Sequence, residues 1–356
     1  MHRMMPTMRG VLLGSAAAAI FVTTTYGQIN DSIRGAASEA NHFIETPKGW
    51  VHPKTPWGEP DIQANLNMMQ AAGIPLERCA NAVRFGGPPC DMNKAWWTPE
   101  EYKQRVDAAA GRGDLGRQLI EKGEFGRALL SGVTDPATPQ RQTTLIVDPP
   151  TGLLPTLTPE GKKRALEMHS GWSLPGESPS YDWTTDFDSW DRCTTRGMPS
   201  SMMPYRYNGG FKIWQAPGVV VFDLEMIHDS RVIPTDGRPR LNAAHKEYMG
   251  ESRGHWEGNT LVVETTNLNG RNGVGGNGGG TTSDRLKLVE RFTMTDTNTL
   301  QYEVRIDDPG TWAQPWTISF PWKRDQGYGM FEYACHEGNY AMKNILTGAR
   351  ADEGAR

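Results

Sequence analysis

The segment Tyr302-Glu303-Val304-Arg305-Ile306-Asp307 alternates apolar and charged residues. This period of two predicts a β-strand with one face buried and the other in water. The same period recurs from Phe211 to Cys335, interrupted by turn sequences such as Ala216-Pro217-Gly218, Glu257-Gly258-Asn259 and Asp296-Thr297-Asn298. The chain is therefore expected to be mainly β.

The pattern predicts about eight or nine strands joined mostly by tight turns, which is the size of a small up-and-down antiparallel barrel. A two-sheet sandwich is the structural alternative. The predicted strands are Phe211–Gln215, Val219–Met226, Arg231–Pro234, Ser252–Trp256, Thr260–Thr266, Leu286–Met294, Leu300–Asp307, Trp316–Lys323 and Gly329–Cys335.

The N-terminal half lacks this alternation. Thr98-Pro99-Glu100-Glu101 predicts a helix start with Thr as N-cap and Glu at the third position, and the helix should run to about Ala110. Asp114 to Leu130 is predicted as a second, interrupted helix. Thr158-Pro159-Glu160 repeats the start signal.

The chain divides into four predicted regions. Residues 1–27 are a signal peptide and residues 28–60 a proline-containing linker. Residues 61–200 form a helical and irregular region packed on the barrel, and residues 201–350 form the antiparallel β-barrel.

The first residues predict export. His2, Arg3 and Arg9 form a positive n-region, and the apolar run Val11 to Val22 ends before the small residue Gly27. An uncleaved anchor is the alternative, but a bilayer span takes about 20 apolar residues. We therefore expect a periplasmic or secreted protein with no membrane span after signal cleavage.

Nucleic acid is an unlikely partner on charge grounds. Lys+Arg 37 against Asp+Glu 41 gives a formal net charge of −4, and no basic run stands out. Gly273, Gly275 and Gly278 fit G-x-G-x-x-G, but no strand precedes them and no helix follows, so no nucleotide site is predicted. The sequence predicts neither a cofactor nor a metal site, and it leaves the oligomeric state open.

Four cysteines in an exported chain favour disulfides. Three pairings are possible, and four free thiols are the alternative. We expect Cys79–Cys90, around a short loop, and Cys193–Cys335, which would tie the segment before the barrel to the predicted last strand.

Glu225, His228 and Arg231 follow the apolar run Val219-Val220-Val221-Phe222. His228 is a candidate general acid–base group, with Glu225 to orient it and Arg231 to hold an anionic group. Strict alternation turns Glu225 and His228 to opposite faces, so both reach one pocket only if a bulge or bend intervenes. A histidine bonded to backbone at the barrel end is the alternative.

A second polar cluster follows the predicted last strand. Glu332, His336 and Glu337 are candidate proton-transfer groups, and the alternative is a plug that satisfies strand-end backbone groups. The candidate substrate-binding residues are Tyr333, Asn339 and Tyr340, which lie beside this cluster in the sequence, and Trp316 of the preceding predicted strand.

Five ordered motifs carry a family resemblance: Trp190–Gly197, Met226–Pro234, Gly250–Gly258, Asp307-Asp308-Pro309 and Tyr333–Tyr340. Over about residues 140–350 the chain resembles a large family of mostly uncharacterised exported bacterial proteins. The resemblance implies a lipocalin-like (calycin) barrel and no particular activity.

One segment departs from that family. Related chains usually carry a Gly-Val/Ile-Trp strand after a Pro-Asp pair, whereas Pro60-Asp61-Ile62-Gln63-Ala64-Asn65-Leu66 lacks the tryptophan. The first barrel strand is therefore not assigned from the sequence.

These features favour an exported barrel enzyme that acts by His and carboxylate acid–base chemistry on a small apolar or aromatic molecule. Lyase, hydrolase and isomerase reactions all fit. The alternatives are a non-catalytic periplasmic binding or carrier protein and an accessory protein of the cell envelope.

Overall fold

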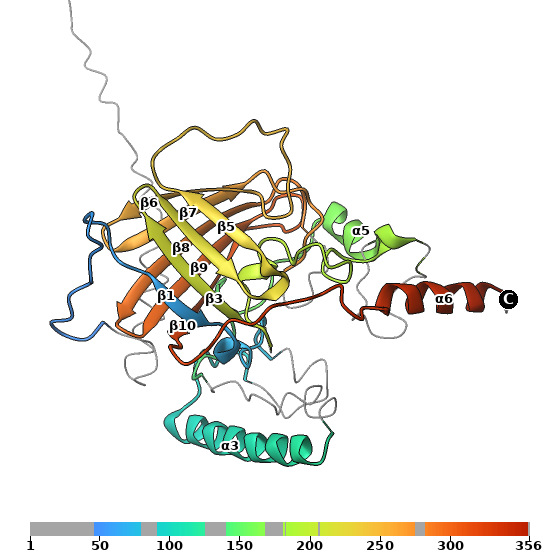
Figure 1. Ribbon diagram of the computed structural model, residues 1–356, viewed down its shortest axis with the longest axis horizontal. Coiled ribbons are helices and arrows are strands. Elements are labelled where there is room, and N and C mark those ends of the chain that lie inside the picture. Colours follow the sequence, from blue (N-terminus) through green and yellow to red (C-terminus); the bar gives the residue numbers. More distant parts are fainter. Residues whose placement is uncertain are drawn as a thin grey trace, which may run out of the picture.

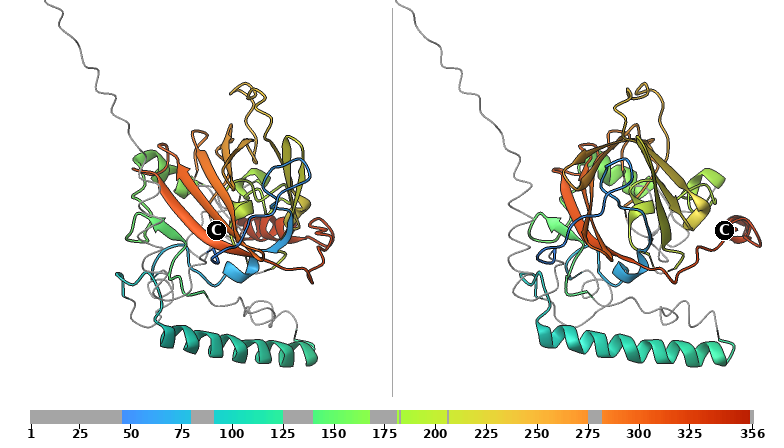
Figure 2. Two further views of the ribbon diagram at one scale, coloured as in Figure 1. Left: turned by 90° about the vertical axis from the view of Figure 1, so that its left-hand side faces the viewer. Right: turned by 60° about the vertical axis from the view of Figure 1, so that its left-hand side comes forward.

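The structure, a computed structural model, describes residues 46–79, 91–124, 140–167, 181, 183–205, 207–274 and 282–354. Nine antiparallel strands form a nearly closed up-and-down barrel, in the order β5-β4-β3-β1-β10-β9-β8-β7-β6 (Figures 1 and 2). The predicted mainly-β barrel is confirmed. The predicted signal peptide, Gly275 and Gly278 lie outside the described residues.

The strands of this order lie close to the ranges expected from the alternation. Their bounds are β1 Ala64–Asn67, β3 Gly210–Ala216, β4 Val219–Leu224, β5 Ser230–Pro234, β6 Glu251–Glu257, β7 Thr260–Thr266, β8 Lys287–Asp296, β9 Thr299–Asp307 and β10 Trp316–Arg324; a tenth strand, β2 Ile146–Asp148, pairs with β10.

The first barrel strand comes from the segment that the sequence left unassigned. β1 pairs with β3 on one side, where Leu66 lies opposite Phe211, and with β10 on the other, where Leu66 lies opposite Arg324. Figure 1 shows β1 in blue between these two strands. The barrel therefore takes one strand from the region that was expected only to pack on it.

The predicted last strand, Gly329–Cys335, is wrong. The final strand is β10, which ends at Arg324, and residues 329–335 form no strand. One edge of β10 pairs with β9 along its length, and its other edge is shared by β1 and β2. No free edge of β10 is left for a further strand.

Aromatic side chains fill the middle of the barrel. Trp316, Phe320 and Trp322 of β10 are fully buried and alternate with residues of the outer face. Tyr302 of β9 stacks on Trp322 with 4.3 Å between ring centroids. Each such ring pair contributes about 0.5–1.5 kcal/mol beyond its buried area. Trp316, a candidate binding residue, thus lies in the core.

A buried polar network lies inside the barrel where β5 and β6, the first and last strands of the order, meet. Arg231 of β5 donates to both carboxylate oxygens of Glu290 on β8, one at 2.8 Å, and to Ser252 Oγ of β6 at 3.1 Å. It also donates to Thr265 Oγ1 of β7, and the Tyr302 hydroxyl donates to Glu290 Oε1 at 2.9 Å. All five side chains are buried.

This network lies where backbone pairing is missing. β5 and β6, both described in full, are neighbours in space at the two ends of the order, but no ladder joins them. Arg231 therefore connects β5 to β6, β7 and β8 through side chains across the seam. Its charge is neutralised by Glu290, and burial together with Glu290 raises the pKa of Tyr302.

Three α-helices of the described residues lie outside the barrel (Figure 1): α3 Pro99–Glu121, α5 Pro159–Glu167 and α6 Ala341–Gly354. The predicted capping box is confirmed, since Thr98 Oγ1 accepts from Glu101 N and Glu101 Oε2 accepts from Thr98 N. α3 is longer than expected because it continues through the position where a second helix was predicted to begin.

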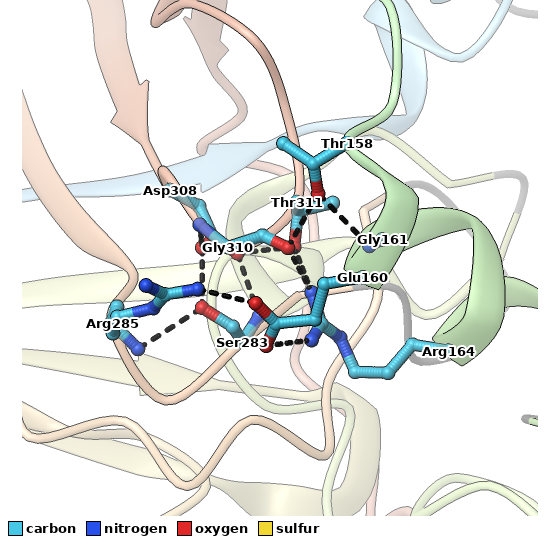
Figure 3. A network of polar contacts seen from close by, with 9 residues as sticks. All are labelled: Thr158, Glu160, Gly161, Arg164, Ser283, Arg285, Asp308, Gly310 and Thr311. Atoms are coloured by element: carbon cyan, nitrogen blue, oxygen red, sulfur yellow. Dashed lines mark hydrogen bonds and ion pairs between the residues drawn. The ribbon is translucent and has the colours of Figure 1, made fainter.

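A polar network holds α5 against the loop after β9 (Figure 3). Asp308 is buried there and accepts hydrogen bonds from Ser283 N, Gly310 N and Thr311 Oγ1 at 2.6–3.0 Å. Arg164 of α5 donates to Gly310 O and pairs with Glu160. The Asp307-Asp308-Pro309 segment is therefore a turn with a capping carboxylate.

Residues 46–60 are the described part of the predicted linker, and within them Trp50 packs against the core of the barrel. Trp50 donates to Thr297 Oγ1, in the β8–β9 turn, and packs edge-on against His52 at 5.2 Å. His52 is buried and its Nδ1 donates to Pro53 O. Burial lowers the pKa of His52, with Lys54 adding to the effect and Asp61 opposing it.

Arg231→Met is expected to lower the free energy of unfolding by about 3–5 kcal/mol, because it leaves Glu290 buried without a counter-charge. Urea denaturation followed by tryptophan fluorescence measures this. The double variant R231M/E290M should recover most of the loss, since neither charge remains. Arg240→Met, which breaks a half-exposed pair with Glu264, is the control and should change stability by about 1 kcal/mol or less. Equal losses in R231M and R240M would contradict the role assigned to the network.

Stability should fall as pH drops below about 6.5, the ordinary pKa of histidine. A folded-state pKa lowered at His52 means that the unfolded chain binds more protons, so acid favours unfolding. His52→Gln should flatten this part of the stability curve, measured by urea denaturation between about pH 5 and pH 8. His245→Gln, an exposed control, should leave the curve unchanged. An unaltered curve in H52Q would refute the assignment.

Candidate functional site

A hollow lies at the end of the barrel where β3 begins and β4 ends. Its lining residues combine both charge signs with apolar groups: Met68, Arg196, Ser201, Asn208, Gly210, Leu224, Glu225 and Met226. It measures about 230 Å³, counting the open space at its mouth. The enclosed part that the centre of a water molecule can occupy is about 10 Å³, which is room for about one water molecule.

Glu225 lies at the end of β4 with its carboxyl group buried, and only 2% of the residue is exposed. Its backbone N–H donates to Gly210 O at 3.0 Å, which fixes the chain across the start of β3. The Oε1 atom accepts from Asn208 Nδ2 at 2.6 Å, whereas Oε2 has no hydrogen-bond partner among the residues that the structure describes. A buried carboxyl oxygen without a donor is costly, which makes it the most informative atom of this site.

Gly210 allows this arrangement by having no side chain. A Cβ atom placed there would lie 2.6 Å from Glu225 Oε2 and 2.3 Å from Cε1 of Tyr328. The missing methyl group therefore leaves the space into which both the carboxyl group and the tyrosine ring reach.

A strained turn follows Glu225. η4, Met226–His228, holds Ile227 at φ 60° and His228 at φ 46°, a left-handed conformation that is rare for a β-branched residue. Ile227 is buried with Met226 and Trp190, and Tyr333 packs against them. The bend that the sequence required between Glu225 and His228 is thus present, and packing holds it in place.

The bend does not bring both side chains into the hollow. Glu225 lines it, but His228 is exposed, and its Nδ1 lies 3.2 Å from Tyr333 O. Because a carbonyl oxygen only accepts, Nδ1 carries the hydrogen, and in the neutral ring Nε2 is the proton acceptor. The neighbouring Asp229 accepts from Thr195 Oγ1 at 2.5 Å, and burial raises its pKa.

Arg196 is the buried cation of the site. Its guanidinium carbon lies 5.4 Å from the ring centre of Trp190 and 5.0 Å from that of Tyr205. Burial lowers its pKa to about 10, opposed by Tyr205, Tyr207, Tyr333 and Asp188. Burial and the neighbouring phenols raise the pKa of Tyr207.

The chain after β10 crosses this end of the barrel. We call residues 325–340 the strap. Tyr328 reaches Gly210, Tyr333 packs on Ile227, and a disulfide joins Cys335 to Cys193. Asn339 Nδ2 also donates to Cys193 Sγ at 3.2 Å. The predicted Cys193–Cys335 bond is present; Cys79 is also disulfide-bonded, and its predicted partner Cys90 lies outside the described residues.

The other candidate residues of the strap lie away from the hollow. They are exposed, and none belongs to its lining: Glu332, His336, Glu337, Asn339 and Tyr340. Tyr333 is half-buried. Arg231 is inside the barrel in its ion pair with Glu290.

Arg196 and Asn208 were not identified from the sequence. Arg196 stands inside Trp190–Gly197, a segment that drew attention only for its family resemblance. Asn208 lies just before β3 at φ 47°, and nothing in its sequence context marks it.

Among the residues that the structure describes, no group of three or more His, Cys, Asp or Glu is placed to hold a metal ion. None of the described helices is long and apolar enough to cross a membrane. Comparison with protein-family models, with curated proteins and with solved structures found no match.

Replacing both Cys193 and Cys335 by serine is expected to loosen the strap. The bond closes a loop of 142 residues, and a disulfide of this kind contributes about 2–4 kcal/mol. Chymotrypsin should cleave the variant faster at the exposed Phe331, which mass spectrometry of the fragments detects. Glu337→Gln, which keeps the bond, should be cleaved like the wild type. Equal cleavage of the disulfide variant would show that the bond does not hold the strap.

Proposed function

We propose that the protein is a barrel enzyme of an extracytoplasmic compartment that acts on a small molecule by proton transfer at the strap end of the barrel. Glu225 is the acid–base group of this proposal. The observation that carries it is the Oε2 atom of Glu225, which is buried at the wall of a hollow and has no donor within the described part of the chain. A carboxyl group held in this way is available to a reacting group.

The neighbours of Glu225 supply supporting roles. Arg196 is suited to hold a negative group of the substrate or a charge that develops during the reaction. His228 sits two residues past the hollow and is suited to pass a proton between solvent and the site. Arg231 has no role in this proposal because Glu290 already neutralises it.

The exposed strap residues have a weaker part in the proposal. In this proposal, Glu332, His336 and Glu337 exchange protons with solvent. Asn339 and Tyr340 contact the substrate at the rim of the hollow. The size of the hollow favours a molecule much smaller than the aromatic compound expected from the sequence. Lyase, isomerase and hydrolase chemistry all remain compatible with one carboxyl group and one arginine.

Export is part of the proposal. The disulfide between Cys193 and Cys335 is consistent with an extracytoplasmic location, since such bonds persist in oxidising compartments. A periplasmic or secreted location follows if residues 1–27 act as a signal peptide.

A carrier without catalysis is the second candidate. It is favoured by one observation: His228 and Glu225 share no side-chain contact, so no acid–base pair is preassembled. In that case the carboxyl group binds a ligand and does not exchange a proton with it.

The test is turnover of a panel of small metabolites in D₂O, followed by mass spectrometry, which registers both new products and deuterium uptake. Glu225→Gln should reduce the wild-type rate by about 10²–10⁴-fold, the usual contribution of a general acid–base group. Glu121→Gln, exposed at the end of α3 and without a role in the proposal, is the matched control and should keep the wild-type rate. Conversion at the wild-type rate in E225Q would refute the proposal. A stoichiometric ligand that stays unconverted would decide for carriage.

A further inference from the structure

The outer face of the barrel carries paired charges on one side. Glu264 Oε2 of β7 lies 3.2 Å from Lys287 Nζ of β8, and Glu257 Oε2 of β6 lies 3.0 Å from Arg291 Nη1 of β8. Cross-strand ion pairs of this kind are usual on the solvated face of an antiparallel sheet. The outer face of β6, β7 and β8 is therefore suited to contact with water.

The outer face of β3, β4 and β5 is apolar instead. Trp214 lies opposite Val221, and Val221 lies opposite Val232, so these residues form one row across the three strands. Ala216 and Val219 lie opposite each other in the neighbouring row. We call these five residues the apolar patch. Trp214 is 47% exposed and Val232 58%, and none of the three α-helices of the described residues covers them (Figure 1). A contiguous exposed patch of this kind marks a site of association.

Two opposite charges border the apolar patch without pairing to each other. Lys212 of β3 and Asp223 of β4 lie directly opposite each other, in the row beyond Trp214 and Val221. Lys212 Nζ lies 3.7 Å from the ring centre of Trp214, and Asp223 Oδ1 accepts from Ser230 Oγ at 3.2 Å. Neither charge has an ion-pair partner within the part of the chain that the structure describes. Both are therefore available to a partner chain.

This arrangement of residues is complementary to itself. A two-fold axis that runs parallel to β3 and β4, midway between them, places β3 of one copy over β4 of the other. Residues that lie opposite each other within one sheet then face each other between the copies. Lys212 faces Asp223 of the partner subunit, and Trp214 faces Val221 of the partner subunit. An isologous interface requires this kind of self-complementarity, and two sheets can pack face to face in this way about 10 Å apart.

We propose that two copies of the chain form a symmetric dimer through the outer face of β3, β4 and β5, with Trp214 at its centre. Burial of a tryptophan at the middle of a small patch is the usual way in which such a contact gains its energy. An anionic lipid surface attracts Lys212 but repels Asp223, whereas a second copy matches both charges. The dimer does not depend on the function proposed for the hollow.

Sedimentation velocity of the wild-type protein between about 1 and 100 µM tests the proposal, because a small interface is expected to dissociate in this range. The sedimentation coefficient should rise with concentration from that of a monomer toward that of a dimer. A monomer at every concentration would overturn the inference. A monomer that floats with vesicles of phosphatidylglycerol and phosphatidylcholine would assign the apolar patch to a membrane and would also overturn it.

An exchange of charges tests the symmetry of the contact. Lys212→Asp and Asp223→Lys each bring like charges together across the axis, so each variant alone should dimerise about tenfold or more weakly than the wild type. An equal mixture of K212D and D223K should recover the dimer, because every lysine of one copy then faces an aspartate of the other. A mixture that associates no better than the single variants would contradict the proposed arrangement.

Lys287→Asp, on the charged outer face of β8, is the matched control and should dimerise like the wild type. Loss of the dimer in K287D, equal to that in K212D, would show that the outer face of β3 and β4 is not the contact.

A second measurement uses the wild-type sequence alone. Protein labelled with ¹⁵N is mixed with unlabelled protein, and a carbodiimide joins lysine to carboxylate groups that are in contact. Mass spectrometry should find peptides that contain Lys212 of one label joined to Asp223 of the other, which identifies a link between two copies. Links between copies at other surfaces, with none between these two residues, would overturn the inference.

Discussion

The ion pair between Arg231 and Glu290 is the interaction on which the rest of the structure depends. Every other neighbouring pair in the barrel order is joined by backbone hydrogen bonds, but β5 and β6 are not. Arg231 crosses this seam to reach β6, β7 and β8 at once. A buried pair is costly to desolvate, and here each partner makes further hydrogen bonds: Arg231 donates to Ser252, and Thr265 and Tyr302 donate to Glu290.

The closed interior has a consequence for function. Since aromatic rings and this ion pair occupy the middle of the barrel, a site has to lie at an end. At the strap end, Glu225 and the strained turn that directly follows it lie beside Arg196, which comes from a separate segment before β3. The disulfide from Cys193 to Cys335 fastens the strap over them. The disulfide therefore connects the strap to the segment that carries Arg196 of the hollow.

Most of the barrel was predictable from the sequence because its strands alternate clearly. β1 was missed because Ala64-Asn65-Leu66-Asn67 is short, polar and without β-branched residues, and its place is determined by partners on β3 and β10. Residues 329–335 were predicted as a strand because Phe331, Tyr333 and Cys335 alternate with other residues. In the structure Tyr333 packs on Ile227 instead, and β10 has no edge left to pair with.

The site was predictable only in part. Glu225 stood out as an ionisable residue at the end of an apolar strand, and the structure places it at the hollow. Arg196 did not, because its burial comes from tertiary contacts with Trp190 and Tyr205 that no local pattern reveals. Arg231 looked like an anion-binding residue for the same reason: its partner Glu290 lies on another strand, 59 residues away.

The central claim about function is that the Glu225 carboxyl group is kept available for a substrate. It is tested most directly by a crystal structure of the ligand-free protein at a resolution that shows ordered water. We expect a water molecule or a small ligand in the hollow, hydrogen-bonded to Glu225 Oε2, with no protein donor on that atom. A hydrogen bond from Tyr328 or another side chain to Oε2, with the hollow closed, would contradict the claim that this carboxyl group is kept available for a substrate.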